Sequence, residues 1–276
     1  MLWSLLAVLT VGSAPVPPLQ LNAICFGIGG AIGLIWVTAT GGLRDLFKVS
    51  PWVYVFGTAG LFGYHLLYFS ALRMAPAAEA GLIAYLWPLL IVLLSGLLPG
   101  EKLRGTHVLG AVFGFSGAAL IVARGMTGFT PAAVPGLALA LACAFTWAIY
   151  SIISRRWHDV PTGSVMVFCL ATSLLSAVAH LVFETTTWPA TNHGWFSIAA
   201  LGIGPVGLAF FIWDVGVKKG DIQLLGVASY AAPLLSTLAL VLAGYAEPSM
   251  TLLFAATLIV AGAALASASS ATARET

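Results

Sequence analysis

Residues 78–98 read AEAGLIAYLWPLLIVLLSGLL, an apolar run whose one charge, Glu79, lies next to its N-terminal end. A helix rises about 1.5 Å per residue and the hydrocarbon core of a bilayer is about 30 Å thick, so roughly 20 apolar residues cross it. Inside lipid the backbone polar groups must be bonded within the segment, and a helix achieves this. This stretch therefore predicts a membrane-spanning helix.

The whole chain shares this character. Of its 276 residues, 60% are hydrophobic and only 7% are charged, whereas soluble domains carry roughly 25% charged residues. So few charges cannot cover a water-facing surface, which predicts lipid as the surrounding solvent. No basic stripe indicates nucleic acid, and we expect none as a partner.

Hydropathy and chain breakers predict ten spans. The first has only about half the length needed to cross the hydrocarbon core. Either the natural chain begins upstream of Met1 or this helix is partial, and we favour missing N-terminal turns. The predicted spans are 1–11, 21–38, 52–72, 78–98, 106–123, 133–153, 163–184, 195–217, 222–243 and 250–268.

Lys and Arg lie almost entirely on one side of these spans. Only Arg73 and Arg124 fall on the other side. Because positively charged loops stay inside, this pattern predicts that both termini are cytoplasmic. The basic residues on the predicted inner side are Arg44, Lys48, Lys102, Arg104, Arg155, Arg156, Lys218, Lys219 and Arg274.

The sequence repeats itself at an offset of about 145 residues. The segment YLWPLL at 85–90 matches YAAPLL at 230–235, and GAALI at 117–121 matches GAALA at 262–266. Each copy, 1–123 and 133–268, holds five predicted spans, and an odd number inverts the second copy in the membrane. The predicted fold is therefore an all-α membrane protein of ten transmembrane helices in two inverted five-helix repeats. Inverted repeats suit alternating access, in which the halves exchange conformations.

Ten spans, the five-plus-five repeat, the doubled Tyr-x-x-Pro-Leu-Leu segment and tryptophans at Trp3 and Trp147 resemble the drug/metabolite transporter superfamily, EamA type. Within it the chain looks most like bacterial aromatic amino-acid exporters of the YddG kind. The resemblance implies a multi-pass protein of the bacterial inner membrane, a monomer or weak oligomer. It also implies a central cavity walled by spans 1, 3, 4, 6, 8 and 9.

His65 lies in the middle of its span, where an ionisable group is costly and usually faces the bundle interior. We predict that it donates to a substrate carboxylate or carbonyl, with Tyr64 and Tyr68 beside it. The alternative is a hydrogen-bonded core histidine. The sequence does not assign its neutral or charged form.

Further aromatic residues lie in mid-span positions. Tyr and Trp offer stacking faces and polar tips, which suit an aromatic or amphipathic substrate that carries an ammonium group. Single aromatics in spans are more often packing or interfacial residues. We predict substrate contacts for Tyr85, Trp87, Trp147 and Tyr230.

Pro88 and Pro233 lie at matching places in the two copies. A proline inside a helix removes a hydrogen bond and kinks it. We predict that both prolines kink their spans and shape the cavity or its gating. The alternative is a structural kink without a functional role.

Two carboxylates have basic partners four residues away on a helix. Asp214 precedes Lys218, which favours an ion pair at the interface, with a proton site as the alternative. His180 and Glu184 have the same spacing and predict a local pair.

Enzyme motifs are absent from the sequence: there is no HExxH, GxSxG or nucleotide loop, so we expect no enzyme, cofactor or metal site. Cys25, Cys143 and Cys169 read as buried apolar residues. The favoured function is a secondary transporter that exports aromatic or neutral amino acids, with a small-molecule substrate as partner. The alternatives are a multidrug or hydrophobic-amine exporter of the same fold, and a membrane protein that transports nothing.

Overall fold

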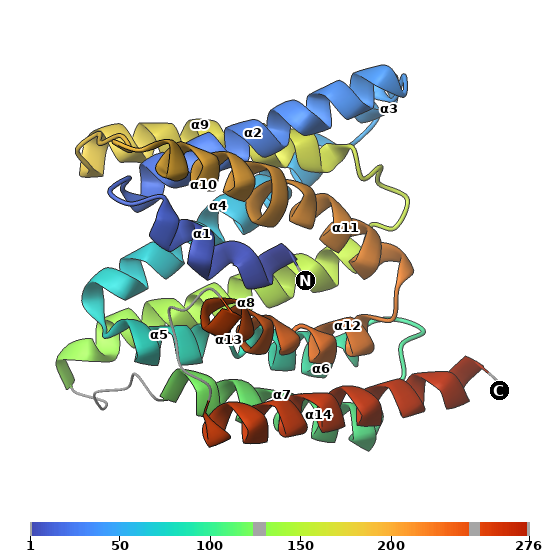
Figure 1. Cartoon of the computed structure of the whole chain (residues 1–276). Helices are drawn as coiled ribbons and strands as arrows, with labels where there is room; N and C mark the ends of the chain where they lie inside the picture. The colour runs from blue at the N-terminus through green and yellow to red at the C-terminus, as the bar shows by residue number, and fades with distance from the viewer. Residues whose placement is uncertain (1, 124–130, 243–248, 275–276) are drawn as a thin grey trace. The chain divides into compact units, whose positions relative to one another are not determined.

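The computed structural model describes residues 2–123, 131–242 and 249–274, and every regular element within these ranges is a helix (Figure 1). The elements are η1 (Leu2–Leu5), α1 (Leu6–Gly12), α2 (Pro18–Ala39), α3 (Leu43–Leu46), α4 (Pro51–Met74), α5 (Ala77–Ala84), α6 (Trp87–Ser95), α7 (Gly105–Val122), η3 (Pro131–Ala133), α8 (Val134–Arg156), α9 (Ser164–Phe183), α10 (Asn192–Ile203), η4 (Gly204–Leu208), α11 (Ala209–Lys219), α12 (Ile222–Ala228), α13 (Ala231–Leu242) and α14 (Met250–Arg274).

Eight helical segments in the described ranges are long and apolar enough to cross a membrane. Two shorter apolar segments, Leu2–Gly12 and Glu79–Ser95, occupy the places of the predicted first and fourth spans. The first ends at Gly12, and the fourth is interrupted after Ala84. The all-helical class is confirmed, and the count of ten spans stays a prediction.

The helices form two compact units that differ from the two sequence repeats. Unit 1 contains Met1–Leu66 and Trp157–Val215, and unit 2 contains Leu67–Arg156 and Gly216–Thr276. Each unit therefore combines segments from both halves of the chain. The predicted domains, residues 1–123 and 133–268, rest on the sequence repeat and stay a prediction.

In unit 1, α2 and α9 pack along each other in opposite directions (Figure 1). Near the start of α2, the Asn22 side-chain amide donates to the Ser176 hydroxyl at 2.7 Å. Further along α2, a Cβ atom at Gly33 would lie 2.9 Å from the Cβ atom of Met166. Small residues let two helix backbones approach closely in a membrane. Residue numbers increase along α2 in the direction in which they decrease along α9, so the two helices are antiparallel.

The N-terminus of α2 is capped by a carboxylate from the end of α9. The backbone N–H groups of Leu19 and Gln20 donate to Glu184 at 3.0 and 3.2 Å. Glu184 also pairs with His180 at 3.0 Å, and both side chains are buried. A negative charge at a helix N-terminus is favoured by the helix dipole and satisfies amides that have no intrahelical partner. The predicted pair of His180 and Glu184 is confirmed, and its main structural role is this cap.

In unit 2, helices α7 and α14 pack closely against each other at glycine residues. A Cβ atom at Gly110 would lie 2.6 Å from the Gly262 carbonyl oxygen, and one at Gly117 would lie 2.7 Å from the Ala255 carbonyl oxygen. The helices are therefore antiparallel and nearly in backbone contact. Positions 110 and 255, and likewise 117 and 262, differ by 145, so the crossing is centred on matching residues of the two copies. This fits the inverted repeat, which stays a prediction.

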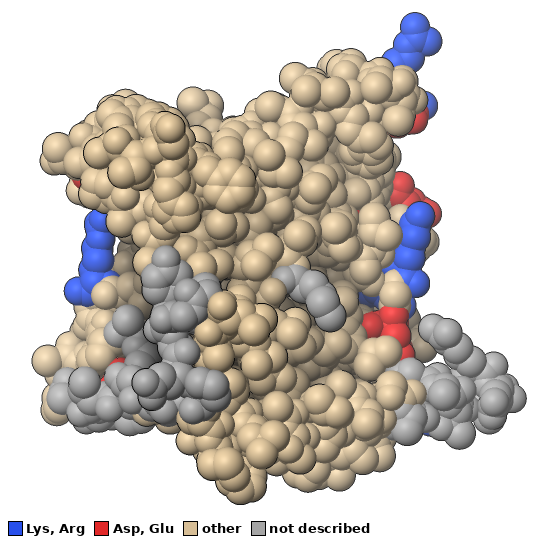
Figure 2. Space-filling model, viewed as in Figure 1, with Lys and Arg blue, Asp and Glu red and all other residues tan. Residues whose placement is uncertain are grey.

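Much of the described surface is apolar, as expected for a surface that contacts lipid. Among the described residues in view in Figure 2 few are charged, and their Lys, Arg, Asp and Glu side chains lie toward the margins. Large apolar side chains such as Leu181, Leu242 and Ile35 are exposed to the surroundings. Since water would not support this much exposed apolar surface, the chain is a multi-pass membrane protein.

We predict that Glu184→Gln lowers the free energy of unfolding by about 1–3 kcal/mol, because the buried cap loses its charge while its size is kept. Thermal unfolding in detergent measures the effect. The control is Asp159→Asn, whose side chain is 91% exposed and pairs only with an exposed histidine in the described chain. Equal melting temperatures for the two variants would contradict the role of Glu184.

We predict that Gly110→Ala destabilises the protein by about 1–3 kcal/mol, because the added methyl group would overlap the backbone of α14. The change in helix propensity, about 1 kcal/mol in favour of Ala, acts in the opposite direction. Gly105→Ala on the same helix is the matched control, since its Cβ atom would meet no atom within 4 Å. A Gly110→Ala protein that is as stable as the control would show that the crossing has room.

Candidate functional site

The predicted site residues are divided between the two units. Tyr64 and His65 belong to unit 1, although they lie on the same helix, α4, as Tyr68. Each set is described within its own unit. The residues that belong to unit 2 are Tyr68, Tyr85, Trp87, Trp147 and Tyr230.

The His65 imidazole lies among aromatic rings of unit 1. Its ring centre is 5.0 Å from that of Phe26, in an edge-to-face arrangement, and 6.1 Å from that of Phe210. Tyr64 stands 5.2 Å away, and Phe26 stacks on Phe210 at 5.3 Å. Sequence reasoning found His65 and Tyr64 but missed Phe26 and Phe210, because a phenylalanine in an apolar span gives no distinguishing pattern.

A backbone carbonyl determines which nitrogen of the His65 ring carries a proton. Its Nδ1 atom lies 2.7 Å from the Leu61 carbonyl oxygen. A carbonyl oxygen only accepts, so Nδ1 carries the proton and donates. In the neutral ring, Nε2 is then an acceptor, and only the imidazolium form donates from both nitrogens. The predicted donation from His65 to a carboxylate therefore requires either the charged form or a contact through Nδ1.

A π-helical segment lies beside this cluster. Between α10 and α11 the chain makes the wider turns of η4, and π-helical segments often occur at functional sites. The Trp3 indole N–H donates to the Pro205 carbonyl oxygen at 3.0 Å. The Trp3 ring also lies 6.0 Å from Phe210 and 5.1 Å from Trp213. Trp3 thus fastens the short first helix of unit 1 to η4, next to the ring that borders His65.

Asp214 is buried on α11 of unit 1, with 2% of its surface exposed. The Thr162 hydroxyl donates to its Oδ2 atom at 2.7 Å. For this carboxylate the sequence predicted an ion pair with Lys218 or a proton site. Both of those roles stay predictions.

Two helices of unit 2 are broken at matching positions. The first break separates α5 from α6 at Tyr85 and Leu86, and the second separates α12 from α13 at Ser229 and Tyr230. At both places the chain makes short i to i−3 hydrogen bonds, such as Leu86 to Ile83. Tyr85 and Tyr230 differ by 145, so the sequence repeat reappears here as a shared local structure.

The prolines lie in the first turns of the helices that follow these breaks. Pro88 is the second residue of α6 and Pro233 the third of α13. The first N–H groups of a helix have no intrahelical partner, so the missing proline N–H costs little there. Each proline thus lies just after a short stretch of i to i−3 hydrogen bonding, and the kinks that the sequence predicts at Pro88 and Pro233 stay a prediction.

Tyr230 joins the two broken helices. The Leu89 backbone N–H, in the first turn of α6, donates to the Tyr230 hydroxyl oxygen at 3.0 Å. The Tyr230 ring is fully buried against Gly114 and lies 6.2 Å from Phe115. Tyr230, in the second repeat copy, thus accepts a hydrogen bond from a backbone amide next to the break in the first copy. A substrate contact for Tyr230 stays a prediction.

Three aromatic rings of unit 2 form a second cluster. Trp87 lies edge-to-face to Trp147 at 6.4 Å, and Trp147 stacks on Tyr150 at 5.1 Å. All three are at least 94% buried. Tyr85 lies in the break before Trp87, and Tyr68 neighbours Phe69 at 6.2 Å. The structure therefore brings Trp87 and Trp147 together, and their contact with a substrate stays a prediction.

Comparison with models of known protein families identifies the family of this chain. The model of the EamA-like transporter family matches residues 1–123 and 134–268. The chain belongs to the EamA-like transporter family. It is therefore a membrane transporter rather than an enzyme, as its sequence predicted.

Known relatives of this family member include exporters. It is 55% identical over 270 residues to the aromatic amino acid exporter YddG of Ancylobacter novellus, which covers 96% of the chain and 93% of the relative. It is 27% identical over 252 residues to the YddG of Salmonella typhimurium, covering 86% and 83%. A probable terminal-alkyne amino-acid exporter of Streptantibioticus cattleyicolor is 24% identical over 250 residues, covering 84% and 81%. A solved crystal structure with 54% identity superimposes with a TM-score of 0.91 and covers 96% of this chain and 93% of its own.

We predict that Tyr230→Phe lowers the free energy of unfolding by about 1–3 kcal/mol. The ring remains, but the Leu89 amide loses its acceptor inside an apolar region. Chemical or thermal unfolding in detergent measures the difference. Unchanged stability would mean that another group, or water, satisfies this amide.

Proposed function

We propose that the chain is a secondary transporter that exports aromatic and other neutral amino acids by alternating access. The proposal is supported by the 55% identity to a relative named an aromatic amino acid exporter. Its structural support is the aromatic cluster around His65, an ionisable group in the middle of a predicted span. A polar group at this depth is costly, and it is usually associated with a pathway for a polar substrate.

The aromatic residues would recognise the side chain of the substrate. Ring pairs arranged edge to face or offset are worth roughly 0.5–1.5 kcal/mol beyond the area they bury. We propose that Tyr64 of unit 1 and Tyr68, Tyr85, Trp87 and Trp147 of unit 2 make such contacts. Trp87 and Trp147 already pair in this way with each other.

His65 would bind the polar end of the amino acid. Its Nδ1 proton is directed to the Leu61 carbonyl, so the neutral ring would accept a hydrogen bond from the substrate ammonium through Nε2. Rings such as Tyr64 and Phe210 would add cation–π attraction for the same group. An imidazolium would instead favour the carboxylate. We favour the neutral form, because the surrounding rings of Phe26 and Phe210 supply no counter-charge.

The breaks at Tyr85 and Tyr230 would provide the moving parts. Discontinuous helices at matching positions of two repeat copies are typical of transporter binding sites and of the segments that rearrange around them. We propose that Pro88 and Pro233 maintain these breaks, since a proline has no N–H to bond the carbonyl four residues before it, on the other side of the break. The backbone at each break can then change direction at small cost.

Export of hydrophobic amines is the second candidate. A neutral His65 that accepts from an ammonium would serve an aromatic amine as well as an amino acid. The discriminating feature is the carboxylate. If phenylethylamine competes with phenylalanine as effectively as tryptophan does, the carboxylate is not recognised, and the amine reading is favoured.

We predict saturable uptake of phenylalanine into proteoliposomes, and a loss of about tenfold or more in transport for His65→Ala, because the polar end of the substrate loses its partner. His158→Ala is the matched control, since that side chain is 67% exposed. Unchanged transport by folded His65→Ala protein would exclude His65 from the site. No flux of any amino acid by the wild type would refute the proposed function.

A further inference from the structure

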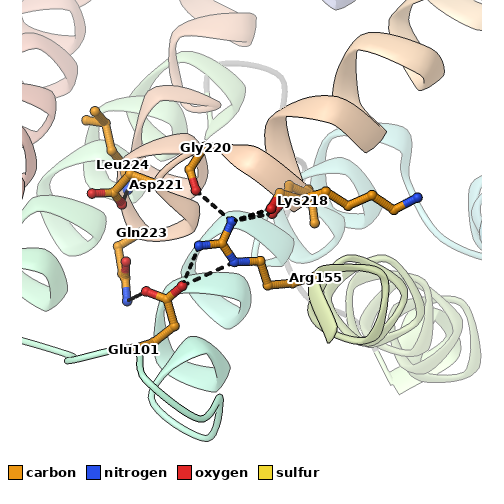
Figure 3. A network of polar contacts seen from close by, with 8 residues as sticks. Glu101, Arg155, Lys218, Gly220, Asp221, Gln223 and Leu224 are labelled. Carbon is orange, nitrogen blue, oxygen red and sulfur yellow. Dashed lines mark hydrogen bonds and ion pairs between the residues drawn. The ribbon is translucent and has the colours of Figure 1, made fainter. Parts of the chain in front are cut away.

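Arg155 is the centre of a polar network in unit 2 (Figure 3). It is the penultimate residue of α8. Its Nη1 atom donates to three backbone carbonyl oxygens, and its Nε and Nη2 atoms donate to Glu101 Oε1 at 3.1 and 2.7 Å. The three carbonyls belong to Val217, Lys218 and Gly220, at 2.9, 2.9 and 2.8 Å. One guanidinium therefore holds together the end of α8, the connection from α6 to α7, and the connection from α11 to α12.

The chemistry of this network requires arginine. Carbonyl oxygens at the C-terminus of α11 have no intrahelical partner, and a cation there is favoured by the helix dipole. The planar guanidinium serves several acceptors at fixed angles, which a lysine ammonium cannot do. Gln223 extends the network by donating to Glu101 Oε2 at 3.3 Å. Asp221 caps α12 beside it, through the Leu224 N–H at 2.8 Å.

The network lies where the chain passes from one compact unit to the other. The chain leaves unit 2 between Arg156 and Trp157, one residue after Arg155, and it enters unit 2 between Val215 and Gly216, one residue before the first carbonyl that Arg155 binds. The passage between Val215 and Gly216 lies inside α11, and the third passage, between Leu66 and Leu67, lies inside α4. Arg155 thus fastens two of the three passages to a single point of unit 2.

We propose that Arg155, held by Glu101, is a positioning residue that couples these two passages and so sets the rate of the conformational step of transport. With both passages fixed to one guanidinium, a movement of unit 1 is carried through them together. Without it, the two connections flex separately and the step becomes less concerted. This inference deepens the proposed function, because a conformational step matters only to a protein that alternates access.

The partial burial of the network fits this role. The side chains of Arg155 and Glu101 are 23% and 19% exposed, so the ion pair is shielded more than an ordinary surface pair. For comparison, the Lys48 and Asp45 side chains pair at 2.8 Å but are 75% and 58% exposed. Exposed pairs contribute little, whereas breaking a shielded one leaves an uncompensated charge. Only the shielded pair can hold backbone segments in place.

The test separates turnover from binding. In proteoliposomes with phenylalanine, Arg155→Gln and Glu101→Gln are expected to lower the maximal rate by roughly fivefold or more, with the KM within about twofold of wild type. Arg156→Gln removes the same charge from the next, exposed position and is expected to leave both quantities unchanged. Arg155→Lys, which keeps the charge but loses the fork, is expected to behave like Arg155→Gln. A wild-type maximal rate in folded variants, or a KM that rises in proportion to the lost rate, would overturn the proposal.

Hydrogen exchange tests the coupling without any substrate. In Arg155→Gln, exchange is expected to rise in both connections, residues 157–163 and residues 216–223. A rise confined to 216–223 would show that Arg155 only caps α11, and would overturn the coupling. If the wild type transports no amino acid but exchange rises in both segments, the proposed function fails while the coupling stands.

Discussion

The structure depends on the rule that a backbone polar group inside a membrane needs a partner. A continuous helix meets this rule by itself, but every helix end and break creates amides or carbonyls that do not. In the described chain, several such places receive a side chain from a distant segment. Glu184 accepts from the start of α2, Tyr230 accepts from the start of α6, and Arg155 donates to the end of α11.

These caps explain why the interruptions can exist where function needs them. The alternating access proposed above requires places where helices change direction, and we propose the proline-marked breaks of unit 2 as two of them. Each break exposes amides that lipid would not solvate. The Tyr230 hydroxyl accepts a hydrogen bond from such an amide at the start of α6. The Trp3 indole N–H donates to a carbonyl of the π-helical segment in unit 1. Tyr230, for which the sequence predicted a substrate contact, thus holds the backbone in this structure, as does Trp3.

Much of this was predictable from local patterns. Apolar runs indicated the helices, the spacing of His180 and Glu184 indicated their pair, and the doubled Tyr-x-x-Pro segment indicated equivalent places in two copies. The rest depends on which helices meet, and no local pattern records that. Phe26 borders His65 only because α2 and the first part of α4 belong to one unit, and Arg155 looked like one more cytoplasmic charge. The compact units themselves mix both halves of the chain, which the repeat alone did not indicate.

The distinction between repeated and unrepeated features bears on how such a protein works. The breaks and the glycine crossing of α7 and α14 recur at the offset of 145 residues, whereas the charged caps do not. The position that corresponds to Arg155 is Thr10, and the one that corresponds to Glu184 is Ala39. Under the alternating access proposed above, perfect duplication would make the outward and inward states equal in energy, whereas imperfect duplication lets their energies, and so their resting populations, differ. Charged side chains placed once, at the ends of helices, can supply that difference without disturbing the shared architecture of the spans.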